Sequence, residues 1–379
     1  MRGLVSQSGV ALRSLLICGL LTWALALAPV QTVAASGSEA DTLVRIGVLG
    51  LFQPTELRVS ANPGTAFVFT IGGQSKTLSG GSALAVIHAS DGHILVSSQG
   101  WSDVLEGSQL GARVLRGSPR FWLEVPGKLR REYAGALEIR PHGQVLEAVV
   151  TMPLETAVAS IVQAESPPDA GLEALKAQAV AARSFLLARQ TSHVGFDFCD
   201  TTHCQFLRSP AAEGSPASEA ANATRGLVLT WHDEAAAKDR TLAAMYARSC
   251  GGRTRSLKEI GGAIDGRRSG YPYYAVRCSY CTRHPEQWRR EAVTMQPHSE
   301  RERLAFNRIH GWSALPSMPV ADLVESPDAA SGSIAGRGIG HGVGLCQLGA
   351  AEMARSGSDF RQILAHYYPN TRLTDALVQ

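Results

Sequence analysis

The sequence has little net charge and no basic run. Its 36 Lys and Arg residues nearly balance its 33 Asp and Glu residues, which leaves a formal charge of +3 over 379 residues. Nucleic acid is therefore not an electrostatically favoured partner. The sequence also lacks internal repeats and long low-complexity tracts. Its length suffices for two modest domains with a substantial core.

Long hydrophobic runs are scarce as well. The apolar run Leu15–Ala28 is short for a membrane-spanning helix. Arg2 and Arg13 precede it, and the small residues Val33–Ser36 follow it, which is the pattern of a secretory signal peptide. We expect cleavage near Ala35 and export to the periplasm or cell wall. Contact with the membrane is then transient, through the signal peptide.

Cysteines are few but even in number once the signal peptide is removed. The remaining six are Cys199, Cys204, Cys250, Cys278, Cys281 and Cys346. In an oxidising compartment they can form disulfides, although clustering with histidines argues that some bind metal. Cys278-x-x-Cys281 is compatible with a redox pair, half a metal site or a structural disulfide. If these two bridge among themselves or to Cys250 and Cys346, the sequence does not choose among the three connectivities.

The pattern of elements predicts an α+β fold, with strands first and helices interspersed later. Residues 36–150 alternate short apolar runs with turn formers, at the spacing of strands. Residues 154–190 have helical periodicity, and Leu227–Trp231 indicates a further strand. The tail Gly344–Tyr368 indicates two helices separated near a glycine.

Within the helical part, a lone carboxylate stands before a helix breaker. Glu165 ends an apolar run just ahead of Ser166-Pro167-Pro168, and a second helix is expected from about Asp169. Lys176 and Arg183 are seven residues apart, so they lie on one line at the shoulder of that helix's apolar stripe. The arrangement fits an acid over a polyanionic or sugar-rich groove. It equally fits a helix-terminal glutamate with solvated neighbours.

A short loop gathers nitrogen and sulfur donors. His193, Cys199, His203 and Cys204 lie within twelve residues, and two imidazoles with two thiolates suit tetrahedral zinc. With no open coordination position, such an ion would be structural. The alternatives are a Cys199–Cys204 disulfide with two surface histidines, or residues with no shared role.

Two further segments carry candidate binding residues. The stretch GRGIGHGVGLCQLGA at 336–350 has five glycines in nine residues, which indicates unusual dihedrals or a backbone that approaches a ligand. A flexible glycine loop is the alternative. His341 lies near its centre, and Gln347 follows. In YARSCGG, Tyr246 and Ser249 are candidate hydrogen-bonding groups, because Ser249 lacks the G-x-S-x-G setting of a nucleophile.

Three blocks of the sequence resemble the SpoIID/LytB family of peptidoglycan-remodelling proteins, in the family's order. The first is RREYAGALEIR with PLETAVASIVQAES and EALKAQAVAARSF, the second is YARSCGG with YPYYAVRC and Trp288, and the third is GRGIGHGVGLCQLGAAEMARSG with ILAHYYPNTRL. Together they cover about residues 130–372. Cys204-Gln205-Phe206 stands where many members have a serine, and Ala159-Ser160-Ile161 replaces a usual glycine-containing run. The resemblance divides the chain into a signal peptide (1–35), a strand-rich region (36–128) and a catalytic region with a glycan groove (129–375).

The resemblance implies a lytic transglycosylase that cleaves peptidoglycan glycan strands, stripped of stem peptides, into 1,6-anhydro products. It implies Glu165 as the catalytic residue and a structural zinc next to the active site. Some relatives are described as amidase enhancers, so a non-catalytic partner of a cell-wall amidase is one alternative. A zinc amidase that uses the His/Cys cluster catalytically is another, although four protein ligands with no open position argue against it. The implied substrate-binding residues are Lys176, Arg183, Tyr246, Ser249, His341 and Gln347, and the implied zinc ligands are His193, Cys199, His203 and Cys204.

Overall fold

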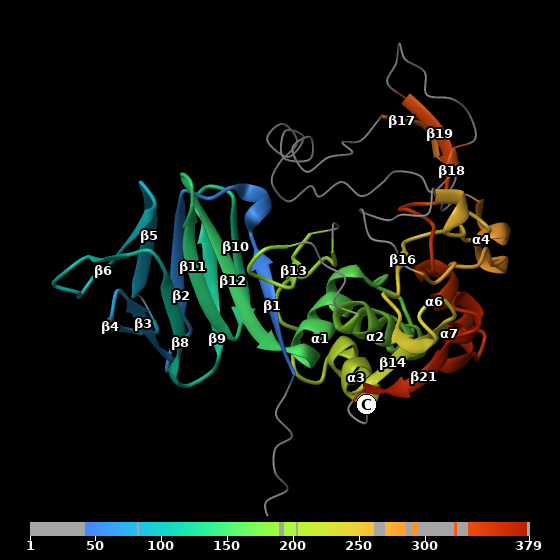
Figure 1. Cartoon of the computed structure of the whole chain (residues 1–379), viewed down its shortest axis with the longest axis horizontal. Helices are drawn as coiled ribbons and strands as arrows, with labels where there is room; N and C mark the ends of the chain where they lie inside the picture. The colour runs from blue at the N-terminus through green and yellow to red at the C-terminus, as the bar shows by residue number, and fades with distance from the viewer. Residues whose placement is uncertain are drawn as a thin grey trace, which may run out of the picture. The chain divides into compact units, whose positions relative to one another are not determined.

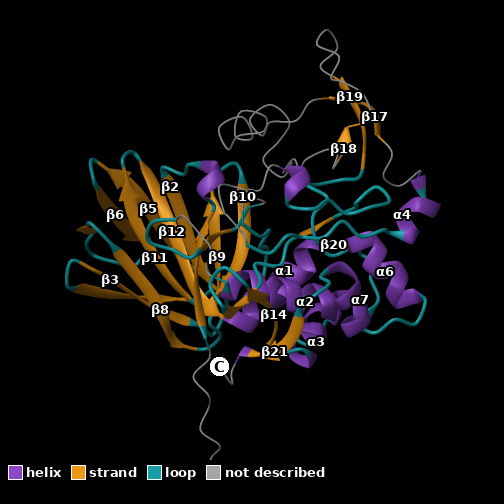
Figure 2. Cartoon of the chain, turned by 45° about the vertical axis from the view of Figure 1, so that its right-hand side comes forward, coloured by secondary structure: helices purple, strands orange, loops and turns teal. Residues whose placement is uncertain are grey.

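The computed structural model describes residues 42–81, 83–188, 193–201, 204–260, 270–285, 290–294, 322–323 and 333–376. The predicted signal peptide and His203 lie outside these residues. The described chain has the predicted α+β fold, with strands up to residue 153 and helices interspersed after it (Figures 1 and 2). Among the described residues, no helix combines the length and apolar character needed to cross a membrane.

The first large sheet has seven strands in the order β13-β1-β12-β11-β8-β3-β4. Its pairs are antiparallel, apart from the parallel pairing of β13 with β1. The strands are β1 (Leu43–Val48), β3 (Ala66–Ile71), β4 (Gln74–Ser79), β8 (Leu110–Arg116), β11 (Ala136–His142), β12 (Val145–Pro153) and β13 (Phe198–Cys199).

The second large sheet has six antiparallel strands in the order β10-β9-β2-β5-β6-β7. Its members are β2 (Glu56–Ala61), β5 (Leu84–Ser90), β6 (His93–Ser98), β7 (Leu105–Gly107), β9 (Arg120–Val125) and β10 (Leu129–Ala134). Alternate residues of β2 and β9 are buried, which is the period-two pattern predicted from the sequence. The two sheets share one hydrophobic core, in which Phe67 and Phe121 pack edge to face at 5.4 Å between ring centroids.

The boundary predicted between residues 128 and 129 falls at the start of β10, next to the turn that joins it to β9. Strands β9 and β10 on its two sides form an antiparallel pair. Strands β11 and β12, from the predicted catalytic region, join β8 and β1 of the strand-rich region. Both sheets therefore contain strands of the two predicted regions. Strands of one region form backbone hydrogen bonds with strands of the other.

The helices α1 (Leu154–Glu165), α2 (Leu172–Leu187) and α3 (Pro216–Ala223) follow the sheets and pack on one another. Helix α2 begins at Leu172, with Gly171 as its N-cap, rather than at about Asp169. The difference has a local cause: the Ala170 N–H donates to the Pro167 carbonyl, so residues 167–170 form a turn before the helix. Helix α2 contacts α3, α6 (Gln347–Arg355) and α7 (Phe360–Tyr367), which confirms the two predicted C-terminal helices (Figure 2).

The other elements form small sheets beside these helices. One is β15-β14-β21, a second is the parallel pair β16-β20, and a third is β17-β19-β18. A short helix, α4 (Ser279–Arg283), lies against α6. Two 3-10 turns occupy Gly50–Phe52 and Lys258–Ile260. The strands are β14 (Leu227–Asp233), β15 (Lys238–Thr241), β16 (Tyr246–Ala247), β17 (Arg290–Thr294), β18 (Asp322–Leu323), β19 (Ser333–Arg337), β20 (Leu345–Cys346) and β21 (Arg372–Asp375).

Candidate active site

Glu165 is the last residue of α1. The helix stops there because Ser166 precedes a proline and adopts an extended conformation, which the following ring favours. The residue is half-buried. A carboxylate at this position is held by a rigid helix on one side and by a fixed turn on the other.

The surroundings of Glu165 raise its pKa to about 7. Desolvation is the main cause, since burial disfavours the charged carboxylate. Two groups act in the opposite direction: the Phe206 backbone N–H, which donates a short hydrogen bond to Oε1, and the Tyr246 hydroxyl. At neutral pH such a carboxyl group exchanges protons readily, which is what a general acid and base needs.

Two residues near this carboxylate, and one residue next to Phe206 in the sequence, carry buried polar atoms without a hydrogen-bond partner of normal geometry. Among the described residues, the Tyr246 hydroxyl, the Gln178 Nε2 and both polar atoms of the Gln205 side chain have no partner of normal geometry. Tyr246 is nevertheless close enough to Glu165 and Gln178 for both to act on its pKa, which burial raises well above the ordinary value. Unsatisfied buried groups are costly, so these groups suggest a site prepared for a polar ligand.

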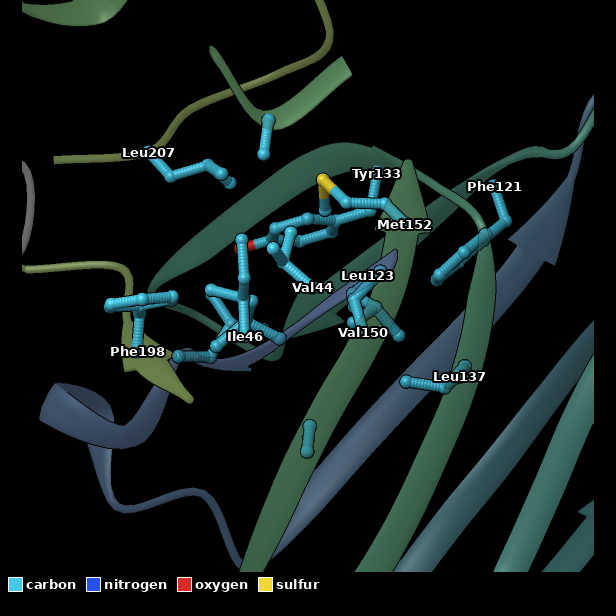
Figure 3. Close-up of a cluster of buried hydrophobic side chains, with 14 of the residues drawn as sticks. Val44, Ile46, Phe121, Leu123, Tyr133, Leu137, Val150, Met152, Phe198 and Leu207 are labelled. Carbon is cyan, nitrogen blue, oxygen red and sulfur yellow. The ribbon is translucent and has the colours of Figure 1, made fainter. Parts of the chain in front are cut away.

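The segment around Phe206, described at residues 198–201 and 204–207, is anchored on the β-sheets. The Asp200 carboxylate accepts hydrogen bonds from the Leu49 N–H at 3.2 Å and from the Arg131 guanidinium at 3.1 Å, and both charged side chains are buried. Phe198 and Leu207, at its two ends, lie in the hydrophobic core beside Ile46 and Val44 (Figure 3). The sheets therefore set the position of the Phe206 N–H relative to Glu165.

The same segment brings together three of the four predicted zinc ligands. One donor atom each of His193, Cys199 and Cys204 lies within 4.8 Å of the others, and the His193 Nε2 is 3.2 Å from the Cys204 Sγ. The fourth predicted ligand, His203, lies outside the described residues. The described donors, one imidazole and two thiols, fit the preference of zinc.

Strand β16 brings Tyr246 to the site through the glycine-rich segment. Tyr246 and Ala247 pair in parallel with Leu345 and Cys346. A Cβ on Gly344 would lie 1.9 Å from the Met245 carbonyl oxygen, and one on Gly340 would lie 3.2 Å from the Ala247 Cβ. Both glycines have positive φ, 71° and 96°. These glycines thus allow the approach of the chain's own strand, where the sequence had indicated approach to a ligand.

Three other predicted binding residues lie in the same two segments: Ser249 follows β16, and His341 and Gln347 flank β20. Ser249 is fully buried and forms a bridge with Ile339, and its Oγ lies 3.3 Å from the Cys281 Sγ. The His341 Nδ1 accepts a hydrogen bond from the Val343 N–H at 3.1 Å. Gln347 begins α6 and is buried. Ser249 therefore lies beside a cysteine sulfur, inside the protein.

The two predicted groove cations are bound within the protein. The Lys176 ammonium is 2.6 Å from Glu173, one turn away on the same helix. Arg183 has no exposed surface, and its guanidinium donates to both carboxylate oxygens of Glu155 at 2.6 and 2.8 Å. It also donates to the carbonyls of Ala221 and Leu227. Arg183 thus joins α1, α2, α3 and β14, and it is not placed to reach a ligand.

Three residues near Tyr246 or Phe206 were not predicted from the sequence. Gln178 had a signal, since it is a polar residue within the apolar stripe of α2. Gln205 had none, because its place depends on the fold of the loop. Arg208 lies with its guanidinium 3.8 Å from the centre of the Phe206 ring, and burial together with the nearby Arg131 lowers its pKa to about 10. It is a cation on the segment of Phe206, close to Asp200 and Arg131.

Fold and site together define an α+β protein in which a helix ends at a partly buried carboxyl group with a raised pKa, and in which the segment that contacts this group also carries a His/Cys cluster. The sequence model of the family described as stage II sporulation protein (SpoIID) matches residues 142–231, which include Glu165 and the His/Cys segment. The predicted resemblance to the SpoIID/LytB family is therefore confirmed for this part of the chain.

Three relatives accompany this match. The chain is 27% identical over 282 residues to an uncharacterized protein of Brachyspira hyodysenteriae, covering 64% of this chain and 73% of that protein. It is 24% identical over 278 residues to stage II sporulation protein D of Bacillus subtilis, covering 61% and 77%. Over 47 residues it is 45% identical to the amidase enhancer of Bacillus subtilis, which is 12% of this chain and 7% of that protein.

Proposed function

We propose that this protein is an exported lytic transglycosylase of the bacterial cell wall, with Glu165 as its acid and base. The observation that carries the proposal is the pKa of about 7 at a half-buried carboxyl group that has the Tyr246 hydroxyl beside it. The kinship with stage II sporulation protein D and with an amidase enhancer supports a role at the cell wall. Export through cleavage near Ala35 is part of the proposal.

The chemistry needs one carboxyl group. Ordinary glycoside hydrolysis uses two, one to protonate the leaving oxygen and one to act as nucleophile or base. In a lytic transglycosylase, Glu165 gives its proton to the glycosidic oxygen, and the bond from that oxygen to the anomeric carbon breaks. The sugar's own C6 hydroxyl then forms a bond to that carbon and returns its proton to Glu165. The product is a 1,6-anhydro end, and no water is consumed.

The neighbouring groups fit these steps. The Phe206 N–H donates to the ionised carboxylate and stabilises it after the first proton transfer. The Tyr246 hydroxyl and the amides of Gln178 and Gln205 have hydrogen-bonding capacity left for sugar hydroxyls. His193, Cys199 and Cys204, with His203 as the fourth ligand, would hold zinc as a structural clip on this segment.

The test compares the wild type with Glu165→Gln on purified glycan strands that lack stem peptides. We expect wild type to release fragments with anhydro ends, identified by mass spectrometry, and Glu165→Gln to bind the strands without releasing them. Glu213→Gln, an exposed glutamate in a loop, is the control for loss of charge and should keep full activity. A wild type that binds strands but releases no anhydro product contradicts the proposal.

One observation favours a second function. A segment of 47 residues is 45% identical to a protein named amidase enhancer. In this second function the protein binds peptidoglycan and stimulates a cell-wall amidase. The rate at which the amidase releases stem peptides would rise on addition of wild type and of Glu165→Gln alike. If only the wild type raises the rate of the amidase, the effect comes from cleavage of the glycan strands by Glu165.

A further inference from the structure

Four cysteines that the proposed function does not use converge inside the protein. They come from the end of the YARSCGG segment (Cys250), from α4 and its N-cap (Cys278 and Cys281), and from the end of β20 (Cys346). All four are buried, and their Sγ atoms lie within 4.8 Å of one another. Segments nearly a hundred residues apart in sequence therefore present sulfur to one point.

The spacing of the sulfurs suits a shared metal ion. The Cys281 and Cys346 sulfurs are 3.6 Å apart. Four thiolates around a tetrahedral zinc at Zn–S distances of about 2.3 Å stand roughly 3.8 Å from one another. Two disulfides would need only two close pairs, whereas here each sulfur is near all of the other three. The Cys-x-x-Cys spacing at 278–281 is also one that structural zinc sites use.

Hydrogen-bond donors surround the sulfurs. The Gly349 N–H donates to the Cys346 Sγ at 3.4 Å, where Cys346 is the N-cap of α6. The Ser249 hydroxyl lies 3.3 Å from the Cys281 Sγ, and the Tyr367 hydroxyl lies 3.6 Å from the Cys278 Sγ. Four thiolates and one divalent ion carry a net charge of −2, and outer hydrogen bonds of this kind stabilise such a buried charge.

We propose that Cys250, Cys278, Cys281 and Cys346 hold a second zinc ion, separate from the His/Cys cluster. Its role is structural, because four protein ligands leave no open position. The centre fastens the end of β20 to the segment after β16 and to α4. It thereby keeps Tyr246 in register with Leu345. The assignment is independent of the proposed function, since it concerns the metal and not the substrate.

The first experiment counts metal in the full chain, isolated under argon. We expect Cys281→Ser to lose one equivalent of zinc per chain relative to wild type. Cys204→Ser is the matched control: it loses whatever zinc the His/Cys cluster holds and leaves this centre occupied. X-ray absorption on the Cys199→Ser/Cys204→Ser variant should then show zinc with four sulfur neighbours at about 2.3 Å. Iron in place of zinc, or a mixed nitrogen and sulfur shell, contradicts the assignment.

The second experiment uses the wild type alone, so it does not depend on whether Cys281→Ser folds. The native protein is treated with an alkylating agent with and without a zinc chelator, and the modified peptides are mapped by mass spectrometry. We expect the four cysteines to be alkylated together, and only when the chelator is present. Disulfide-linked peptides among them in protein denatured directly in the alkylating agent, or alkylation unaffected by the chelator, would overturn the proposal. Neither result bears on cleavage of glycan strands.

Discussion

The Glu165 carboxylate and the Phe206 backbone N–H are joined by a short hydrogen bond across 41 residues of sequence. Phe206 follows Cys204 by two positions, so the partner of the proposed catalytic group belongs to the segment that carries the His/Cys cluster. Asp200 fixes the same segment to the sheets through Arg131. The proton affinity of Glu165 thus depends on a loop that a metal ion can hold.

If the His/Cys cluster holds the proposed zinc, we expect its removal to change the pH profile and not just the rate. Without the proposed zinc, the loop no longer holds the Phe206 N–H on the Glu165 carboxylate. A hydrogen bond to a charged group contributes about 1.5–3 kcal/mol. Losing it raises the pKa of Glu165 by roughly 1–2 units, since one unit corresponds to 1.36 kcal/mol. In Cys204→Ser, the fall of kcat/KM at high pH should move upward while kcat drops about 10- to 100-fold.

The control for this prediction is Val194→Ala, which removes an exposed side chain beside His193 in the same loop and keeps all of the proposed ligands. Its pH profile should match that of the wild type. If Cys204→Ser loses the metal and keeps the profile of the wild type, the loop does not set the pKa of Glu165.

The stability of the protein should also change with pH because of Glu165, and it should fall as the pH rises. Its pKa is raised from 4.5 to about 7 on folding, so between these values the folded state holds a proton that the unfolded state has released. Stability from this group is fully present below pH 4.5 and is lost as the pH rises through 7. Glu165→Gln should therefore become more stable relative to wild type between pH 4.5 and pH 8, by up to about 3 kcal/mol. Urea unfolding at the two pH values measures the difference, and Glu213→Gln should show none.

Much of the fold follows from local patterns in the sequence. Strand β3 (Ala66–Ile71), like the other strands from β1 to β11, lies in the region 36–150 that was predicted to form strands, because short apolar runs between turn formers are decided within a few residues. The end of α1 at Glu165 likewise follows from the two prolines. The start of α2 was misplaced, since Asp169 has the side chain of an N-cap but lies in a turn that Pro167 closes. Turn geometry of this kind is not visible in a residue pattern.

The site was predictable where it rests on residue type and not where it rests on long-range packing. Donor types alone selected His193, Cys199 and Cys204, and the structure brings their donor atoms together. A cation on a helix shoulder, by contrast, can face a ligand or a buried carboxylate. Arg183 faces Glu155, 28 residues earlier, and nothing in the spacing indicates that pairing. The sheets decide it by fixing where α1 starts.

Tyr246→Phe should separate activity from stability. The Tyr246 hydroxyl is buried without a partner of normal geometry among the described residues, so its removal leaves the unfolding free energy within about 1 kcal/mol of wild type. Activity should fall about 10- to 100-fold, because the hydroxyl acts on Glu165 and has capacity left for the substrate. Tyr271→Phe is the control: its hydroxyl donates to the Pro369 carbonyl at 2.7 Å, so it should lose about 1 kcal/mol and keep its activity. Full activity in Tyr246→Phe contradicts the role of the hydroxyl.

Replacement of Arg183 should destabilise the protein, because its guanidinium is buried and hydrogen-bonded between helices. Arg183→Met leaves the Glu155 carboxylate and two carbonyls without their donor, and breaking a buried ion pair costs about 3–5 kcal/mol. The double variant Glu155→Leu/Arg183→Met should be more stable than Arg183→Met, since no uncompensated charge remains. Arg355→Ala, which breaks the exposed pair with Glu352, should change the unfolding free energy by less than about 0.5 kcal/mol. Urea unfolding checks all three. A stable Arg183→Met with weakened binding of glycan strands would instead restore Arg183 as a cation of the groove.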